Sequence, residues 1–127
     1  MTTTQSKELF NTALVGQNYS PKTIRAYGDD LMQFIEWVGK NRVDWETPVR
    51  FTRIDIEGFM SYLAGHNMTG VTRVRKLASI RKFFTFMEEN SIIAGNPANT
   101  VKGARREEKE PTVLFKEQYK ALLSELH

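Results

Sequence analysis

The sequence predicts an all-α fold, a compact bundle in which four helices surround one apolar core. Apolar residues recur three and four positions apart in four separate stretches, which is the spacing of amphipathic helices. Residues that favour helix starts precede these stretches, and glycines follow three of them. No stretch shows the alternation of a half-buried strand. A chain of 127 residues that is 40% hydrophobic and 26% charged has the size and composition of one globular domain.

The first predicted helix spans residues 4–15, or 6–15 if Ser6 rather than Thr4 opens it. Gly16 ends it, because glycine is common just beyond the last turn of a helix. Its core-facing residues are Leu9, Phe10, Ala13 and Leu14.

The second predicted helix has the clearest start. Ser20 is a suitable N-cap, and Pro21 occupies the first helical position, where its missing N–H costs nothing. Gly39 is predicted to end the helix. Gly28 lies on the apolar face, and because a mid-helix glycine costs about 1 kcal/mol relative to alanine, we expect another helix to cross closely there. The apolar face consists of Ile24, Tyr27, Leu31, Phe34, Ile35 and Val38.

The third predicted helix opens at Thr52, and Asp55 three residues later forms a near capping box. It stops at Gly65. Its core-facing residues are Ile56, Phe59, Met60 and Leu63. The long loop before this helix contains Trp45 and Pro48, so we expect the loop to pack against the bundle.

The fourth predicted helix, residues 69–87, carries five positive charges and no negative one. Helical spacing gives it an apolar face formed by Leu77, Ile80, Phe84 and Met87. The opposite face consists of Thr72, Arg75, Ser79 and Lys82. Arg73 and Arg81 lie nearer the core boundary, where they either reach a ligand, cover apolar neighbours or pair with acids of another helix.

These residues make the fourth helix a candidate DNA-binding helix. An α-helix fits the major groove of DNA, and Arg, Lys, Ser and Thr are the usual donors to phosphates and base edges. The candidate contacts on this helix are Thr72, Arg75, Ser79, Arg81 and Lys82. The alternative is a basic face that is merely solvated.

The start of the second helix is the other candidate DNA contact. Lys22, Thr23 and Arg25 occupy its first turns, where backbone N–H groups and the helix dipole favour a phosphate. Three acids farther along would repel a DNA backbone, namely Asp29, Asp30 and Glu36. Only the start of this helix is therefore expected to face DNA.

After Asn90 the sequence changes character. Residues 91–98 form an exit turn, and the charged stretch that follows has few large apolar groups, as in a linker. Helical spacing then resumes, but one helix cannot bury an apolar face alone. We predict a helical DNA-binding domain over residues 1–98, a linker over 99–112 and, over 113–127, the first helix of a second domain that this chain does not contain.

Composition excludes several classes of function. The chain has no cysteine, so it has neither a disulfide framework nor a thiolate metal site. No apolar run approaches the ~20 residues that span a membrane, and the N-terminus lacks the apolar core of a signal peptide, so a cytoplasmic protein is expected. Neither a cofactor nor a metal nor a small-molecule substrate is expected. The net charge of +3 is concentrated in the fourth helix, which favours a polyanion partner.

Three stretches of the chain occur in a specific order. The first is Ser20-Pro21-Lys22-Thr23-Ile24, followed by Tyr27, Asp30, Leu31, Phe34 and Trp37. The second is Leu77-Ala78-Ser79-Ile80-Arg81-Lys82-Phe83-Phe84, with Met87 on the same face. The third is Asn96-Pro97-Ala98, a charged linker, Pro111 and Lys116-Glu117-Gln118. Together they resemble the N-terminal core-binding domain of the tyrosine site-specific recombinases, the phage integrase and Xer-type family.

The resemblance implies a four- to five-helix SAM-like bundle that forms one half of a C-shaped clamp around double-stranded DNA. It implies that the helices beginning at Ser20 and near Thr69 face the major groove, and that other recombinase protomers are partners. The family often has Leu-Ser-Ala where this chain has Leu77-Ala78-Ser79. This difference moves the hydroxyl by about 100° around the helix.

The resemblance also implies that the chemistry lies elsewhere. The family needs an Arg, a His-x-x-Arg pair and a nucleophilic Tyr in the second domain. Here Asn67-Met68-Thr69 follows His66 and the chain ends at His127, so it contains no His-x-x-Arg. We therefore expect a fragment of a strand-exchange enzyme with no catalytic residue of its own.

Two other classes of protein fit the same basic face. One is a helical protein-interaction module with an acidic partner. The other is a helix-turn-helix regulator, for which residues 65–69 would form the turn. The sequence also leaves open whether a parent recombinase would serve integration, chromosome dimer resolution, transposition or inversion.

Overall fold

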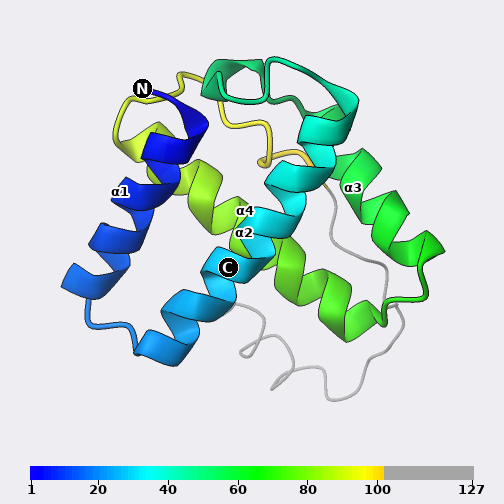
Figure 1. The fold of residues 1–127 in the computed structure, drawn as a ribbon, viewed down its shortest axis with the longest axis horizontal. Helices are drawn as coiled ribbons and strands as arrows, with labels where there is room; N and C mark the ends of the chain where they lie inside the picture. The colour runs from blue at the N-terminus through cyan, green and yellow to red at the C-terminus, as the bar shows by residue number, and fades with distance from the viewer. Residues whose placement is uncertain (102–127) are drawn as a thin grey trace.

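The computed structural model describes residues 1–101, which form four α-helices and one short 3₁₀ helix (Figure 1). The elements are α1 (Thr3–Gly16), α2 (Pro21–Asn41), η1 (Pro48–Arg50), α3 (Arg53–Gly65) and α4 (Gly70–Glu89). No strand occurs among these 101 residues. The predicted all-α fold is confirmed. Most of the predicted linker and the whole of the predicted last helix lie outside the described residues.

Two helix starts follow the predicted caps, whereas α1 begins earlier than predicted, at Thr3 after the cap Thr2. The Ser20 hydroxyl accepts the N–H of Thr23 at 3.1 Å, and Thr52 forms a capping box with Asp55. Thr69 caps α4 in the same way, accepting the N–H of Thr72 at 3.1 Å. Each cap satisfies a backbone donor that the first turn of a helix leaves unpaired.

The predicted end of α2 at Gly39 is wrong, because the helix continues to Asn41. Gly39 lies against the loop instead of ending the helix. A Cβ atom at this position would be 3.4 Å from Cδ1 of Trp45, an ordinary van der Waals distance. As predicted, that loop packs on the bundle, with Trp45 against the core and Pro48 buried.

The helices α2 and α4 cross at the centre of the molecule, and each also packs against α1 and α3. Figure 1 shows α1 on one side of this crossing and α3 on the other. The predicted close crossing at Gly28 is wrong, because the nearest atom to a Cβ there would be Lys7 Nζ at 4.0 Å. The close approach is at Gly58 of α3, where a Cβ would lie 2.8 Å from Cη2 of Trp37.

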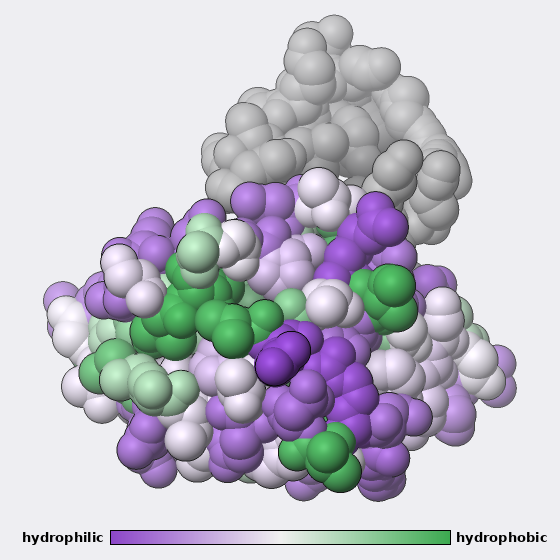
Figure 2. All heavy atoms as spheres, turned by 90° about the horizontal axis from the view of Figure 1, so that it is seen from above, coloured by the Kyte–Doolittle hydropathy of each residue, from purple (hydrophilic) through white to green (hydrophobic). Residues whose placement is uncertain are grey.

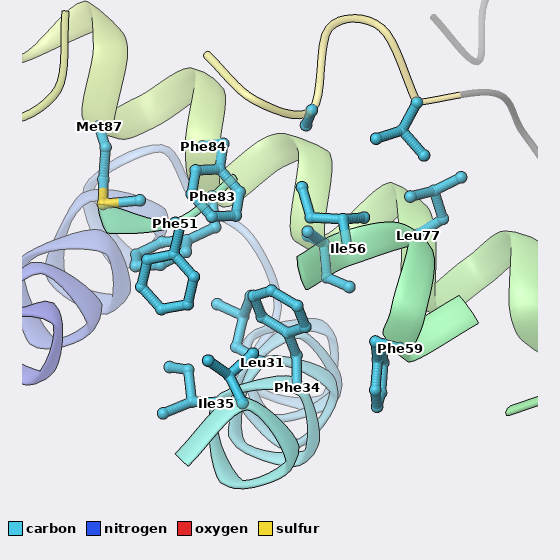
Figure 3. Close-up of a cluster of buried hydrophobic side chains, with 14 of the residues drawn as sticks. Leu31, Phe34, Ile35, Phe51, Ile56, Phe59, Leu77, Phe83, Phe84 and Met87 are labelled. Carbon is cyan, nitrogen blue, oxygen red and sulfur yellow. The ribbon is translucent and has the colours of Figure 1, made fainter. Parts of the chain in front are cut away.

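The core lies where α2, α3 and α4 meet (Figure 3). The ring of Phe34 is at its centre, with centroid distances of 5.6 Å to Phe51, 5.4 Å to Phe59 and 6.2 Å to Phe84. The predicted apolar face of the fourth helix is confirmed, since all of its members are buried: Leu77, Ile80, Phe84 and Met87. A second aromatic group fixes α1, because Phe10 contacts Phe83 of α4 at 5.5 Å between centroids.

The segment after α4 folds back onto the bundle. Ile93, Ala98 and Val101 are buried in the same core. The side chain of Asn96 accepts the N–H of Ala98 at 2.9 Å, which forms the turn. The guanidinium of Arg81 donates to the carbonyl of Val101, so α4 holds the chain at the last described residue.

The surface seen from above is mostly hydrophilic, with apolar side chains gathered in a few separate patches (Figure 2). No helix within residues 1–101 is long and apolar enough to cross a membrane.

Candidate nucleic-acid interface

The exposed side of α4 is narrower than the sequence predicts. Because α4 lies between α2, α1 and α3, its buried positions cover more than the one apolar stripe, and they are Lys76, Leu77, Ser79, Ile80, Phe83, Phe84 and Met87. The exposed positions on its outer side are Val71, Arg75, Ala78, Thr85 and Glu89. Arg75 is therefore exposed as predicted, whereas the outward placement of Ser79 is wrong.

Ser79 is 2% exposed because it faces α2 across the central crossing. Its hydroxyl donates to Oδ2 of Asp30 at 2.7 Å. A buried hydroxyl that is already hydrogen-bonded has neither the access nor a free donor for an outside ligand. The candidate DNA contact at Ser79 is therefore replaced by an internal one.

Asp30 is the centre of a buried polar cluster, with 2% of the residue exposed. Besides Ser79, it accepts from Nζ of Lys76 at 3.0 Å. Lys76 is itself 4% exposed and also donates to Oε1 of Gln33 at 2.6 Å. The expectation that Asp30 repels a DNA backbone at the surface is wrong, because its charge is buried and paired. Asp29 and Glu36 are exposed.

Arg75 connects this cluster to the surface. Its Nη2 lies 3.1 Å from Oδ1 of Asp30, while 52% of its side chain remains exposed. The guanidinium is thus held at one edge by a carboxylate that is itself fixed. A guanidinium has five N–H donors in a planar fork, so with half of the side chain exposed, donors of Arg75 remain for a ligand.

Lys82 joins α4 to the start of α2. Its Nζ lies 5.2 Å from the centroid of the Tyr19 ring, a cation–π contact. Tyr19 immediately precedes the N-cap Ser20, so the ammonium of Lys82 is next to the first turn of α2. Exposed Lys22 is in that turn. The two helices proposed from sequence therefore bring cations to one region.

Three of the remaining candidate residues already form hydrogen bonds within the fold. Thr23 and Thr72 are half-buried, and each hydroxyl accepts from that of the N-cap residue, Ser20 and Thr69 respectively. Arg25 is exposed. Burial lowers the pKa of Arg81, but a guanidinium remains charged at neutral pH. Because its donor group is directed at Val101, Arg81 lies at the core boundary as predicted and serves the fold.

Sequence reasoning missed the buried cluster, although a signal for it exists. Asp30 lies three residues after Tyr27 and four before Phe34, so it occupies the apolar stripe of α2. A charged residue on such a stripe requires a partner from another helix. Lys76 is four residues before Ile80 and lies on the buried side of α4 by the same rule.

The described residues hold no group of three His, Cys, Asp or Glu side chains that could bind a metal ion. The candidate interface consists of cations and hydroxyls on two helices, which are groups that bind phosphates.

Comparison with known proteins gives a consistent result. The sequence matches the family described as "Phage integrase, N-terminal SAM-like domain" over residues 7–90, from within α1 to the end of α4. Tyrosine recombinase XerC of Listeria monocytogenes serotype 4a (strain HCC23) is 30% identical over 106 residues, which cover 84% of this chain and 35% of that protein. Tyrosine recombinase XerC of Chlorobaculum parvum (strain DSM 263 / NCIMB 8327) is 32% identical over 110 residues, covering 84% and 33%.

The chain thus spans about one third of the length of these curated relatives. Among solved structures, a lambda integrase (75–356) dimer bound to a COC′ core site matches with a TM-score of 0.66 and 15% identity. The match covers 98% of this chain and 44% of that chain. At this level of identity, the likeness concerns the fold.

Proposed function

This chain belongs to the phage integrase N-terminal SAM-like domain family, and on that premise we propose that it binds duplex DNA and grips one half of a recombination site. The surface proposed for this contact combines the start of α2 with the exposed side of α4. The whole protein would cut and rejoin DNA strands with residues outside this chain, in an assembly of several protomers. The lambda integrase with the similar fold is a dimer on a core site, which supports the choice of partner.

The observation that carries the proposal is the position of Lys82 over Tyr19. This contact brings a cation of α4 next to the first turn of α2, where the positive end of the helix dipole also favours an anion. The proposed DNA contacts are Lys22, Thr23, Arg25, Thr72, Arg75 and Lys82. Ser79 and Arg81 are left out because the fold uses their donor groups.

Binding of this kind rests mainly on phosphates, so it is weak and depends on salt. We expect a dissociation constant in the micromolar range or above, and a steep loss of affinity between about 50 mM and 200 mM salt. Fluorescence anisotropy of a labelled duplex at both salt concentrations measures this. Affinity that does not change with salt, or no binding at the lower salt concentration, would count against this proposal.

A matched pair of triple variants locates the surface. Lys22→Gln, Arg25→Gln and Lys82→Gln together remove three charges from the proposed contact. A control with Lys40→Gln, Arg50→Gln and Arg53→Gln removes three charges from exposed positions at the other end of α2, in η1 and in α3. We expect the first variant to bind DNA more weakly. The slope of its log affinity against log salt concentration should be smaller by about 3, since each phosphate contact contributes about 1. Equal losses in both variants would refute a localised interface.

A further inference from the structure

The contact between Arg75 and Asp30 assigns a specific task to a residue that does not itself reach the surface. We propose that Asp30 is a positioning residue, which fixes the guanidinium of Arg75 so that it reads a guanine in the major groove. This inference rests on the proposed function, because it names what one side chain of the DNA-binding surface recognises.

The anchor of Arg75 is rigid. Asp30 is buried, and its two carboxylate oxygens are held by Nζ of Lys76 at 3.0 Å and by Oγ of Ser79 at 2.7 Å. Arg75 approaches the same Oδ1 atom that Lys76 contacts, at 3.1 Å. An exposed arginine normally loses rotamer freedom when it binds, so an arginine that is already held forms directional hydrogen bonds at a smaller entropic cost.

A fixed orientation suits a base more than a phosphate. A phosphate contact needs a positive charge near the backbone, which exposed side chains such as Lys22 and Arg25 supply without an anchor. A guanine contact needs two N–H groups aimed at O6 and N7 in the plane of the base. The anchored guanidinium of Arg75 meets the second requirement.

The neighbours of Arg75 on the exposed side of α4 are also suited to contact base edges in the major groove. Val71 and Ala78 lie one turn before it and one turn after it, and Val71 is 81% exposed. Neither side chain can bind a phosphate, whereas apolar side chains contact the methyl group of thymine in the major groove. The exposed side of α4 from Val71 to Ala78 therefore has the composition of a base-reading surface, and the cations beside it supply the phosphate contacts.

The test removes one acceptor atom from the DNA. The 127-residue chain selects its preferred duplex from a randomised pool at low salt, and its affinity is measured for that duplex and for copies carrying 7-deazaguanine at one position. This base lacks N7 but leaves the backbone charge unchanged. We expect the wild-type chain to lose about tenfold in affinity at one guanine. Arg75→Met, which has a long side chain but no N–H donor, should bind the 7-deazaguanine duplex and the unmodified duplex equally.

The role of Asp30 needs a variant that folds. Asp30→Asn combined with Lys76→Met removes both buried charges, and so avoids leaving an ammonium unpaired in the crossing. With a cooperative melting transition, this double variant should retain DNA binding while its discrimination falls to about threefold or less. Asp30→Glu, which keeps the charge but displaces the carboxylate, should lose discrimination in the same way. Asp29→Asn, at the neighbouring exposed acid, should keep it.

Each result decides between the possibilities. Wild-type binding that no 7-deazaguanine weakens, a selection without a guanine-containing site, or tenfold discrimination by Arg75→Met would each overturn the guanine contact. Full discrimination by both Asp30 variants would overturn the positioning role. These results leave DNA binding intact, so they differ from failure of the proposed function, in which the wild-type chain binds no duplex even at low salt.

Discussion

Asp30 shows how one buried carboxylate changes which charges of a helix reach the solvent. The fourth predicted helix carries five cations, but Lys76 is buried against Asp30 and Arg81 is directed at Val101. Arg75 is shared between Asp30 and the surface. The number of cations in a segment is therefore a poor measure of its surface charge when a neighbouring helix supplies an acid.

Two glycines provide a stability test at the same scale. Gly28→Ala should stabilise the protein by about 0.5–1 kcal/mol, because alanine favours helix and the new Cβ meets nothing closer than Lys7 Nζ at 4.0 Å. Gly58→Ala should destabilise it by about 1–3 kcal/mol, because its Cβ would lie 2.8 Å from the indole of Trp37. That indole packs against Phe59 and cannot move freely. Urea unfolding measures both, and stabilisation by both substitutions would contradict the tight contact between α2 and α3.

At the scale of elements, where a helix starts is easier to predict from sequence than which segments pack against it. Ser20 and Thr52 could be predicted as caps because the cap hydrogen bond joins residues three positions apart in the chain. Gly39 lies against Trp45 of the following loop, and no rule based on neighbouring residues in the sequence predicts that contact.

The face of Ser79 was mispredicted for a related reason. One apolar stripe marks one buried side, but a central helix contacts several neighbours and buries polar residues wherever a partner is available. Here the partner is Asp30, 49 residues earlier in the chain. The cations at the start of α2 needed no such partner, so Lys22 and Arg25 are exposed as the sequence predicts.

The loop before η1 is attached to α1 by Glu46, and this attachment depends on pH. The carboxylate accepts the N–H of Thr4 at 2.9 Å and its hydroxyl at 2.7 Å, and these hydrogen bonds lower the pKa of Glu46 below its usual 4.5. A lowered pKa means that the folded state favours the carboxylate. Its contribution to stability is therefore present above the pKa of the unfolded chain and is lost as the pH falls through the folded value.

Glu46→Gln should consequently lower the free energy of unfolding at pH 7 by less than about 1 kcal/mol, because the carboxylate is partly exposed. The difference from wild type should disappear as the pH falls below 4.5. Thr4→Val, which removes only the hydroxyl donor, should show a smaller change of the same sign. Thermal melts between pH 7 and pH 3 measure the effect. A difference that is constant over this range would mean that Glu46 does not form the attachment in solution.

For the whole molecule, the crossing of α2 and α4 is the feature on which both stability and the proposed interface depend. The crossing buries the aromatic core. It also buries the Asp30 cluster, which joins α2 to α4. It also places Lys82 of α4 beside Tyr19 at the start of α2. The fold class could be predicted from helical periodicity. That these cations lie close together could not be predicted, because it depends on the angle at which the two helices cross.

The chain by itself should form no covalent bond with DNA. A nucleophilic tyrosine needs activation and a stabilised phosphorane. The closest histidine to a tyrosine within residues 1–101 is His66 beside Tyr62, with ring centroids 4.2 Å apart, and its Nδ1 lies 2.9 Å from the carbonyl of Tyr62.

Incubation with supercoiled plasmid and with a nicked half-site tests this expectation, with a full-length tyrosine recombinase as the positive control. The plasmid should remain supercoiled, and a denaturing gel should show free protein only. A protein–DNA adduct traced to any tyrosine of this chain would show that it has catalytic residues that the sequence analysis missed.

The bond between Arg81 and the carbonyl of Val101 has a mechanical consequence. Arg75 and Arg81 are six residues apart, so the anchored guanidinium and the point that holds Val101 are separated by about 9 Å of stiff helix. Residue 101 is therefore tied to the same helix that carries the anchored guanidinium, so a reorientation of α4 relative to α2 would move both together.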